Sequence, residues 1–203
     1  MAQTKETKSV AIATDPPFIQ RLFSTGEFAW LWLIARIWLG YQWFVAGEHK
    51  ITDPGWMVTG TSLKGFWTNA TAIPATGKPP IVFDWYRDFL KFLLDSGSYV
   101  WFAKLIAVGE VLIGVALVVG AFVGIAAFMG SFLNWNFMMA GSASTNPLLF
   151  AVATFLVLAW KAAGHWGADR WLLPALGTPW GPGKVFGNGK QKAPIRPQEQ
   201  GSS

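Results

Sequence analysis

The chain has 203 residues, of which 52% are hydrophobic and 13% are charged, whereas a soluble domain carries about 25% charged residues. With 13 tryptophans and no cysteine, this composition favours an integral membrane protein. It excludes disulfides, thiolate catalysis and cysteine-ligated iron–sulfur or haem groups. Two histidines are too few for the usual histidine metal site, so we expect neither a metal nor haem. The basic residues lie mostly in the tails, which argues against a nucleic-acid partner.

Residues 1–27 are polar and of mixed charge, and Asp15-Pro16-Pro17 is interpreted as a helix breaker. The first twenty residues contain no apolar core, so we do not expect a cleavable signal peptide. This stretch is therefore predicted to be an N-terminal segment that precedes an uncleaved membrane anchor.

Four apolar stretches follow, each close to the length that a helix needs to cross a hydrocarbon core of about 30 Å. They are residues 28–47, 99–120, 121–141 and 147–164. The second and third meet at Gly120-Ala-Phe-Val-Gly124 with almost no loop. These two glycines either form the turn or let two helices pack closely through a Gly-x-x-x-Gly motif.

The loop over residues 48–98 separates the first two stretches, and residues 81–95 within it are predicted to form a short amphipathic helix. One stripe of that helix is charged and the remainder is aromatic or aliphatic; the charged residues are Asp84, Arg87, Asp88, Lys91 and Asp95. The Gly, Pro and Lys-rich tail covers residues 174–203, of which 187–203 are predicted to be disordered.

The sequence thus predicts an all-α fold, an integral membrane four-helix bundle in residues 28–173 with a long first extramembrane loop. Four crossings place both termini on one side of the membrane. Basic residues concentrate on that side, so the positive-inside rule assigns both termini to the cytoplasm of a multi-pass membrane protein.

Arg36 and Glu110 lie near the middle of the first and second apolar stretches. An arginine at the bilayer centre costs about 2.5–3.5 kcal/mol on insertion scales, so such groups face the bundle interior and find partners. We expect Arg36 and Glu110 to pair. The pair either fixes helix register or creates a polar site for a quinone, a proton or an anion.

Asn134 and Asn136 cannot share one face of a helix, so one is expected to turn inward, as interhelical glue or as a hydrogen-bond partner for a ligand. His49 and His165 are expected at opposite ends of the bundle, too far apart to ligate one iron. His49 also belongs to a polar rim with Glu48 and Lys50.

The order of these motifs resembles the DoxX family of small bacterial and archaeal membrane proteins. The motifs are an arginine in the first stretch, Gly47-x-x-Lys50, Gly109-Glu110 and Gly164-x-x-Gly167-x-Asp169-Arg170. The long first loop is similar to that of the DoxD type, the small subunit of thiosulfate:quinone oxidoreductase. Over residues 28–173 the resemblance implies a four-helix bundle in the cell membrane, with Arg36, Lys50, Glu110 and Asp169 as candidate catalytic positions.

Two functions follow from this resemblance and composition. In the first, the chain is a subunit of a quinone-linked oxidoreductase that moves electrons from a small anionic donor such as thiosulfate to quinone. Arg36 with Asn134 or Asn136 would hold a quinone carbonyl, and His49 with Lys50 would attract the donor. In the second, the chain is a non-catalytic accessory or assembly subunit that packs through its tryptophans against lipid and other subunits of a larger respiratory or photosynthetic complex. Whether the chain is an enzyme stays open at this level.

Overall fold

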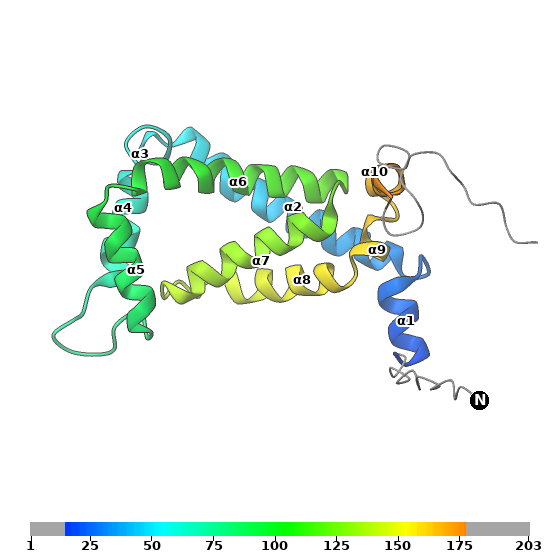
Figure 1. Cartoon of the computed structure of the whole chain (residues 1–203), viewed down its shortest axis with the longest axis horizontal. Helices are drawn as coiled ribbons and strands as arrows, with labels where there is room; N and C mark the ends of the chain where they lie inside the picture. Colours follow the sequence, from blue (N-terminus) through cyan, green and yellow to red (C-terminus); the bar gives the residue numbers. More distant parts are fainter. Residues whose placement is uncertain (1–14, 178–203) are drawn as a thin grey trace, which may run out of the picture.

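A computed structural model describes residues 15–177, in which every regular element is a helix (Figure 1). The residues before 15 and after 177, which include the predicted disordered tail, lie outside the described part. The helices are α1 (Pro17–Ser24), α2 (Ala29–Thr52), α3 (Pro54–Met57), α4 (Thr61–Thr71), α5 (Asp84–Asp95), α6 (Tyr99–Val119), α7 (Val123–Met139), α8 (Asn146–Leu158), α9 (Trp160–Gly164) and α10 (Asp169–Leu176).

Helices α2 and α6 make the most extensive helix–helix contact in the described part of the chain, and small residues make this close packing possible. A Cβ atom on Gly40 would lie 2.9 Å from the carbonyl oxygen of Gly114, and one on Gly47 would lie 2.6 Å from the backbone nitrogen of Val111. Small residues that bring backbones together are typical of helix contacts in membranes. These contacts also fix how α2 is aligned along α6.

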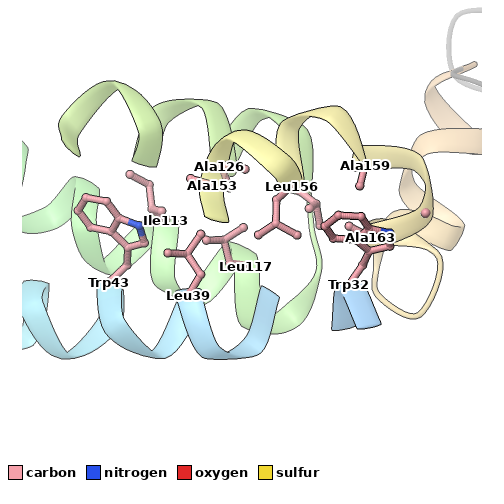
Figure 2. Packing of buried hydrophobic residues seen from close by; sticks show 13 residues of the cluster. Trp32, Leu39, Trp43, Ile113, Leu117, Ala126, Ala153, Leu156, Ala159 and Ala163 are labelled. Atoms are coloured by element: carbon pink, nitrogen blue, oxygen red, sulfur yellow. The ribbon is translucent and has the colours of Figure 1, made fainter. Parts of the chain in front are cut away.

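The main core lies where α2 and α6 face α7 and α8. Figure 2 shows Leu39 and Trp43 of α2 beside Ile113 and Leu117 of α6, with Leu156 of α8 nearby. All five side chains are buried. Apolar burial therefore holds the four longer helices together.

The outward faces of the same helices are also apolar. Large exposed side chains include Ile34 on α2, Leu112 on α6, Phe128 on α7 and Leu158 on α8, with exposed fractions of 59–62%. In the described part of the chain, α6 is the one helix both long and apolar enough to cross a membrane, while α7 and α8 are shorter apolar helices. A surface of this kind is unusual for a protein in water.

Helices α4 and α5 cross one end of the bundle and enclose a second core with α6 and α7 (Figure 1). The amphipathic helix predicted within residues 81–95 is present as α5, which buries Tyr86 and Leu90. Arg87, predicted on the charged stripe, is instead buried, because its guanidinium donates to the Ile81 carbonyl at 2.5 Å and pairs with Asp84.

Several helix boundaries differ from the prediction. Helix α1 begins at Pro17, where a breaker was predicted, because proline suits the first turn of a helix. Helix α2 continues through the polar residues 48–50 to Thr52. The fourth apolar stretch is divided at Ala159 into α8 and α9. Gly120 ends α6 with φ of +76°, so the predicted turn between the second and third stretches is present.

Candidate functional site

The first charged pair joins α2 to α6. Nζ of Lys50 lies 2.6 Å from Oε2 of Glu110, and the Glu110 side chain is 1% exposed while that of Lys50 is 19% exposed. The Lys50 ammonium also donates to the Ala46 carbonyl at 3.2 Å and lies 5.2 Å from the Trp56 ring centroid. Lys50 therefore folds back along α2 to neutralise a carboxylate that has almost no access to solvent.

The second charged group is Arg36, which is buried at the other end of the α2–α6 contact. Its Nη2 donates to the Trp166 carbonyl at 3.1 Å. A Cβ atom on either Gly120 or Gly167 would overlap its Nη1. Two glycines from distant parts of the chain thus make the space in which this guanidinium lies.

Asp169 connects the same region to α7. Its carboxylate accepts hydrogen bonds from the backbone N–H groups of Phe122 and Val123, at 2.5 and 2.9 Å, and so caps the N-terminus of α7. Its own backbone N–H donates to the Gly120 carbonyl at 2.8 Å. Burial raises the pKa of the Asp169 carboxyl, while the two backbone donors and the Arg36 guanidinium act in the opposite direction.

Together these contacts explain the Gly164-x-x-Gly167-x-Asp169 motif. A Cβ atom on Gly164 would lie 2.8 Å from Cβ of Asp169, and Gly167 faces Arg36. The motif places a carboxylate and a close backbone contact against the α6–α7 turn. We call Arg36, Gly120, Gly167 and Asp169 the turn clamp.

The predicted pairing of Arg36 with Glu110 is wrong, although both side chains are buried as expected. Cβ of Glu110 lies beside Gly47, whereas the Arg36 guanidinium lies beside Gly120. Gly47 follows Arg36 by eleven residues, which is about 16 Å along a helix. The prediction aligned the two stretches at their midpoints, but the glycine contacts fix a different alignment. The four predicted catalytic residues therefore form two separate groups, Lys50 with Glu110 and Arg36 with Asp169.

A cavity of about 480 Å³ lies among α4, α5, α6 and α7. Figure 1 shows α6 and α7 diverging from their shared turn toward α4 and α5, and the cavity occupies the wide end. Its lining is almost wholly apolar, with Phe66, Leu105, Leu112, Met129 and Phe132 among its residues. A Cβ atom on Gly109 would meet no other atom within 4 Å, so this glycine leaves the α6 wall open.

Asn136 and Tyr86 are the polar residues of this cavity. The Tyr86 hydroxyl donates toward the backbone carbonyl and Oδ1 of Asn136, both at 3.1 Å. Nδ2 of Asn136 donates to the Phe132 carbonyl at 2.8 Å and has a second N–H. Burial raises the pKa of Tyr86 to about 12. Sequence reasoning found Asn136 but missed Tyr86, whose signal was its place on the apolar face of the amphipathic helix.

Asn134 turns into the bundle core instead, as predicted for one of the two asparagines. It is fully buried, and within residues 15–177 neither its Oδ1 nor its Nδ2 has a hydrogen-bond partner. The same holds for Oγ of Ser131 and Nε1 of Trp43, which faces Gly130 of α7. The face of α7 that is directed into the core therefore carries two buried polar side chains, Ser131 and Asn134, among apolar ones.

His49 lies apart from the cavity. Its side chain is 76% exposed and its Nδ1 is 4.0 Å from the Glu48 carboxylate. His165 lies beside Gly26, just before α2 begins, whereas His49 is near the end of that helix. The two histidines are thus at opposite ends of the bundle.

In comparisons with protein-family models, curated proteins and solved structures, no match to the chain was found.

Proposed function

We propose that the chain is a DoxX-like, multi-pass membrane protein that acts as a quinone-binding subunit of an oxidoreductase. The observation that carries this proposal is the apolar cavity among α4, α5, α6 and α7, with Asn136 and Tyr86 as its polar groups. The apolar outer faces of α2, α6, α7 and α8 support placement in lipid. The basic residues of the tails are the reason for which we propose that both termini lie in the cytoplasm.

The cavity suits a quinone ring in size and chemistry. Its volume of about 480 Å³ falls in the range of small-molecule sites, about 300–1,000 Å³. A quinone is flat and apolar apart from its carbonyl oxygens, which accept hydrogen bonds. The second N–H of Asn136 is the donor available to one such carbonyl, while the Tyr86 hydroxyl donates its one proton to Asn136 and so holds that residue in place.

The route into the cavity also suits a ligand that is dissolved in lipid. Several lining residues are at the same time exposed on the outside of the bundle, namely Leu105, Leu112, Met129 and Phe132, at 43–62%. The cavity thus continues into the lateral surface between α6 and α7. A quinone with an isoprenoid tail could enter with its ring and leave its tail in the bilayer.

In this proposal the buried charged residues hold together the helices that enclose the cavity, and they do not line it. Glu110 follows Gly109 directly, but its carboxylate faces α2 and Lys50, and the turn clamp lies at the narrow end of the α6–α7 space.

Bound quinone would take up two electrons and two protons. Because the chain has no cysteine and no evident electron-carrying side chain, a partner subunit would deliver electrons from the donor, which we propose is a small anion of the thiosulfate type.

Gly109→Leu tests the proposal, because the added side chain enters the cavity from a position with open space around its Cβ. Purified protein in nanodiscs would be titrated with a short-tailed quinone while tryptophan fluorescence is followed. We expect Gly109→Leu to weaken binding at least about tenfold, the effect of losing about 1.4 kcal/mol.

The matched control is Gly65→Leu, on the exposed side of α4, where a Cβ atom also meets nothing within 4 Å. This variant should bind quinone as the unmodified protein does. Equal affinity of the Gly109→Leu variant and the unmodified protein would contradict the quinone site.

The accessory-subunit function has its own supporting observation. Exposed aromatic side chains lie on the outer faces of several helices, including Trp38, Trp101 and Trp135 at 37–55%, and such groups suit contacts with other membrane subunits. Native sizing after mild solubilisation separates the two functions. Co-purification with a large complex, without quinone binding by the isolated chain, would favour the accessory function.

A further inference from the structure

A second cavity lies at the end of the bundle that carries α1 and α10. Its volume is about 350 Å³. Ser24 at the end of α1 and Thr25 and Gly26 of the following linker form one wall, and the opposite wall contains Lys161, His165 and Arg170. This position is far from the quinone cavity, which α4 and α5 close at the other end (Figure 1). The two cavities share no lining residue.

The wall of this cavity is basic, and its charges are not neutralised within the described residues. No carboxylate of that part of the chain lies within 4.0 Å of the charged groups of Lys161, His165 or Arg170. The carboxylates nearest to these residues along the chain have other partners. Glu27 pairs with Arg21, and the Asp169 carboxylate caps α7. The cavity is therefore a positively charged site that lacks its counter-charge.

The other polar groups of the cavity do not supply that counter-charge. The last carbonyl groups of α1 carry the negative end of the helix dipole, but two of them already accept hydrogen bonds. The Thr25 hydroxyl donates to the Arg21 carbonyl, and the Trp32 indole donates to the Leu22 carbonyl, each at 2.7 Å. These bonds reduce the negative potential beside the cavity.

The surroundings of the cavity resemble a membrane–water interface. Large apolar side chains are exposed on the helices around the cavity and on the segment between α9 and α10. They are Phe18 of α1 at 60%, Trp30 of α2 at 51%, Trp166 at 52% and Trp171 of α10 at 72%. Tryptophan next to lysine and arginine is the pattern at the level of lipid headgroups. Helix α1 lies across the bundle axis at this end (Figure 1), as an interfacial helix does.

We propose that the cavity lined by Lys161, His165 and Arg170 binds a phosphate-type anion, presented by an anionic phospholipid headgroup or as free phosphate. Arginine can hold two phosphate oxygens at once, and lysine adds a compact positive charge. A volume of 350 Å³ accommodates one headgroup and leaves the acyl chains against the apolar residues outside. The site does not depend on quinone binding, although its lipid form rests on the proposed placement in a membrane.

The test compares two double variants that each remove two positive charges. Lys161→Gln/Arg170→Gln changes the cavity. Lys78→Gln/Lys91→Gln changes exposed residues of the α4–α5 loop and α5, at the opposite end. Native mass spectrometry of protein purified in neutral detergent would measure retention of phosphatidylglycerol against phosphatidylcholine. We expect phosphatidylglycerol to be preferred, and the cavity variant to bind it about tenfold more weakly because it loses charge-assisted hydrogen bonds.

The control variant should retain the preference, and the charge-conserving Lys161→Arg/Arg170→Lys should retain most of it. If the cavity double variant does not fold, Lys161→Gln alone replaces it. Inorganic phosphate, added as a competitor, separates the two sources: displacement of lipid shows that free phosphate also enters, and its failure identifies the headgroup as the source. A cavity variant that retains phosphatidylglycerol like the unmodified protein, or a control that loses it equally, would overturn the proposal.

Discussion

Replacing Lys50 with methionine removes the positive partner of Glu110 and keeps a side chain of similar length. The Glu110 carboxylate is 1% exposed and its nearest cation is the Lys50 ammonium at 2.6 Å. After the substitution, an unpaired carboxylate would remain between α2 and α6, where the close contact at Gly47 leaves no space for the side chain to move outward. The fold would then contain a buried charge without compensation.

The magnitude follows from how deeply the two groups are buried. Removing one partner of a buried ion pair costs about 3–5 kcal/mol. Because Lys50 is 19% exposed and some water reaches its ammonium, we take the lower end, about 3 kcal/mol. For a protein of this size, 1 kcal/mol shifts Tm by about 2–4 °C, so the expected loss is about 6–12 °C.

The reverse substitution should cost less. Glu110→Met leaves a lysine whose long side chain can extend toward solvent, so we expect about 1 kcal/mol. The double variant Lys50→Met/Glu110→Met replaces the pair with apolar side chains and should be within about 1 kcal/mol of the unmodified protein. The two single effects are therefore not additive.

Thermal unfolding of purified protein in detergent, followed by near-ultraviolet circular dichroism at one fixed scan rate, measures these differences. The reasoning would be refuted if Lys50→Met lowered Tm by less than 2 °C. It would fail equally if the double variant were as unstable as the two single effects combined.

Three further predictions concern the turn clamp and the cavity among α4, α5, α6 and α7. Gly120→Ala should lower the free energy of unfolding by more than the roughly 1–2 kcal/mol that a left-handed conformation costs a residue with a Cβ atom, because the new Cβ atom also displaces Arg36. In the same thermal assay, the control Gly65→Ala on α4 should be neutral or stabilising. Asp169→Ala should cost about 2 kcal/mol, since it removes the cap of α7, and a change in Tm below 2 °C would contradict this role. The Tyr86 phenol should titrate near pH 12 when absorbance at 295 nm is followed, and this step should be absent from Tyr86→Phe. Because the pKa of Tyr86 is higher in the folded than in the unfolded state, its contribution to stability is intact below about pH 10 and is lost as the pH rises toward 12.

The sequence predicted α6 well because a hydrophobic run of about twenty residues is a local signal, whereas the fourth stretch is divided into α8 and α9. Residues 99–120 correspond to α6 almost without change. The end of α2 was missed because Glu48, His49 and Lys50 suggest solvent, although Lys50 folds back to the Ala46 carbonyl and keeps the helix intact. Charge along a helix does not end it when the side chains reach partners.

The candidate site was predicted less well because it depends on helix alignment. Burial of Arg36 and Glu110 follows from hydrophobicity alone, but their partners depend on which residues of α2 lie opposite which residues of α6. Gly40, Gly47 and Gly114 determine that alignment through close backbone contacts. The glycines are visible in the sequence, yet their pairing is a tertiary property that spacing on one helix does not specify.

The same contacts suggest how the two ends of the molecule depend on each other. The turn clamp holds α6 and α7 together at one end, through the Asp169 carboxylate and the glycines that surround Arg36. From this fixed point the two helices diverge toward α4 and α5, and the cavity forms where the distance between them is largest (Figure 1). Because the two helices share this turn, a small change of the angle between them would produce a larger displacement at the wide end. We therefore expect substitutions in the turn clamp to change the width of the cavity, although no residue of the clamp lines it.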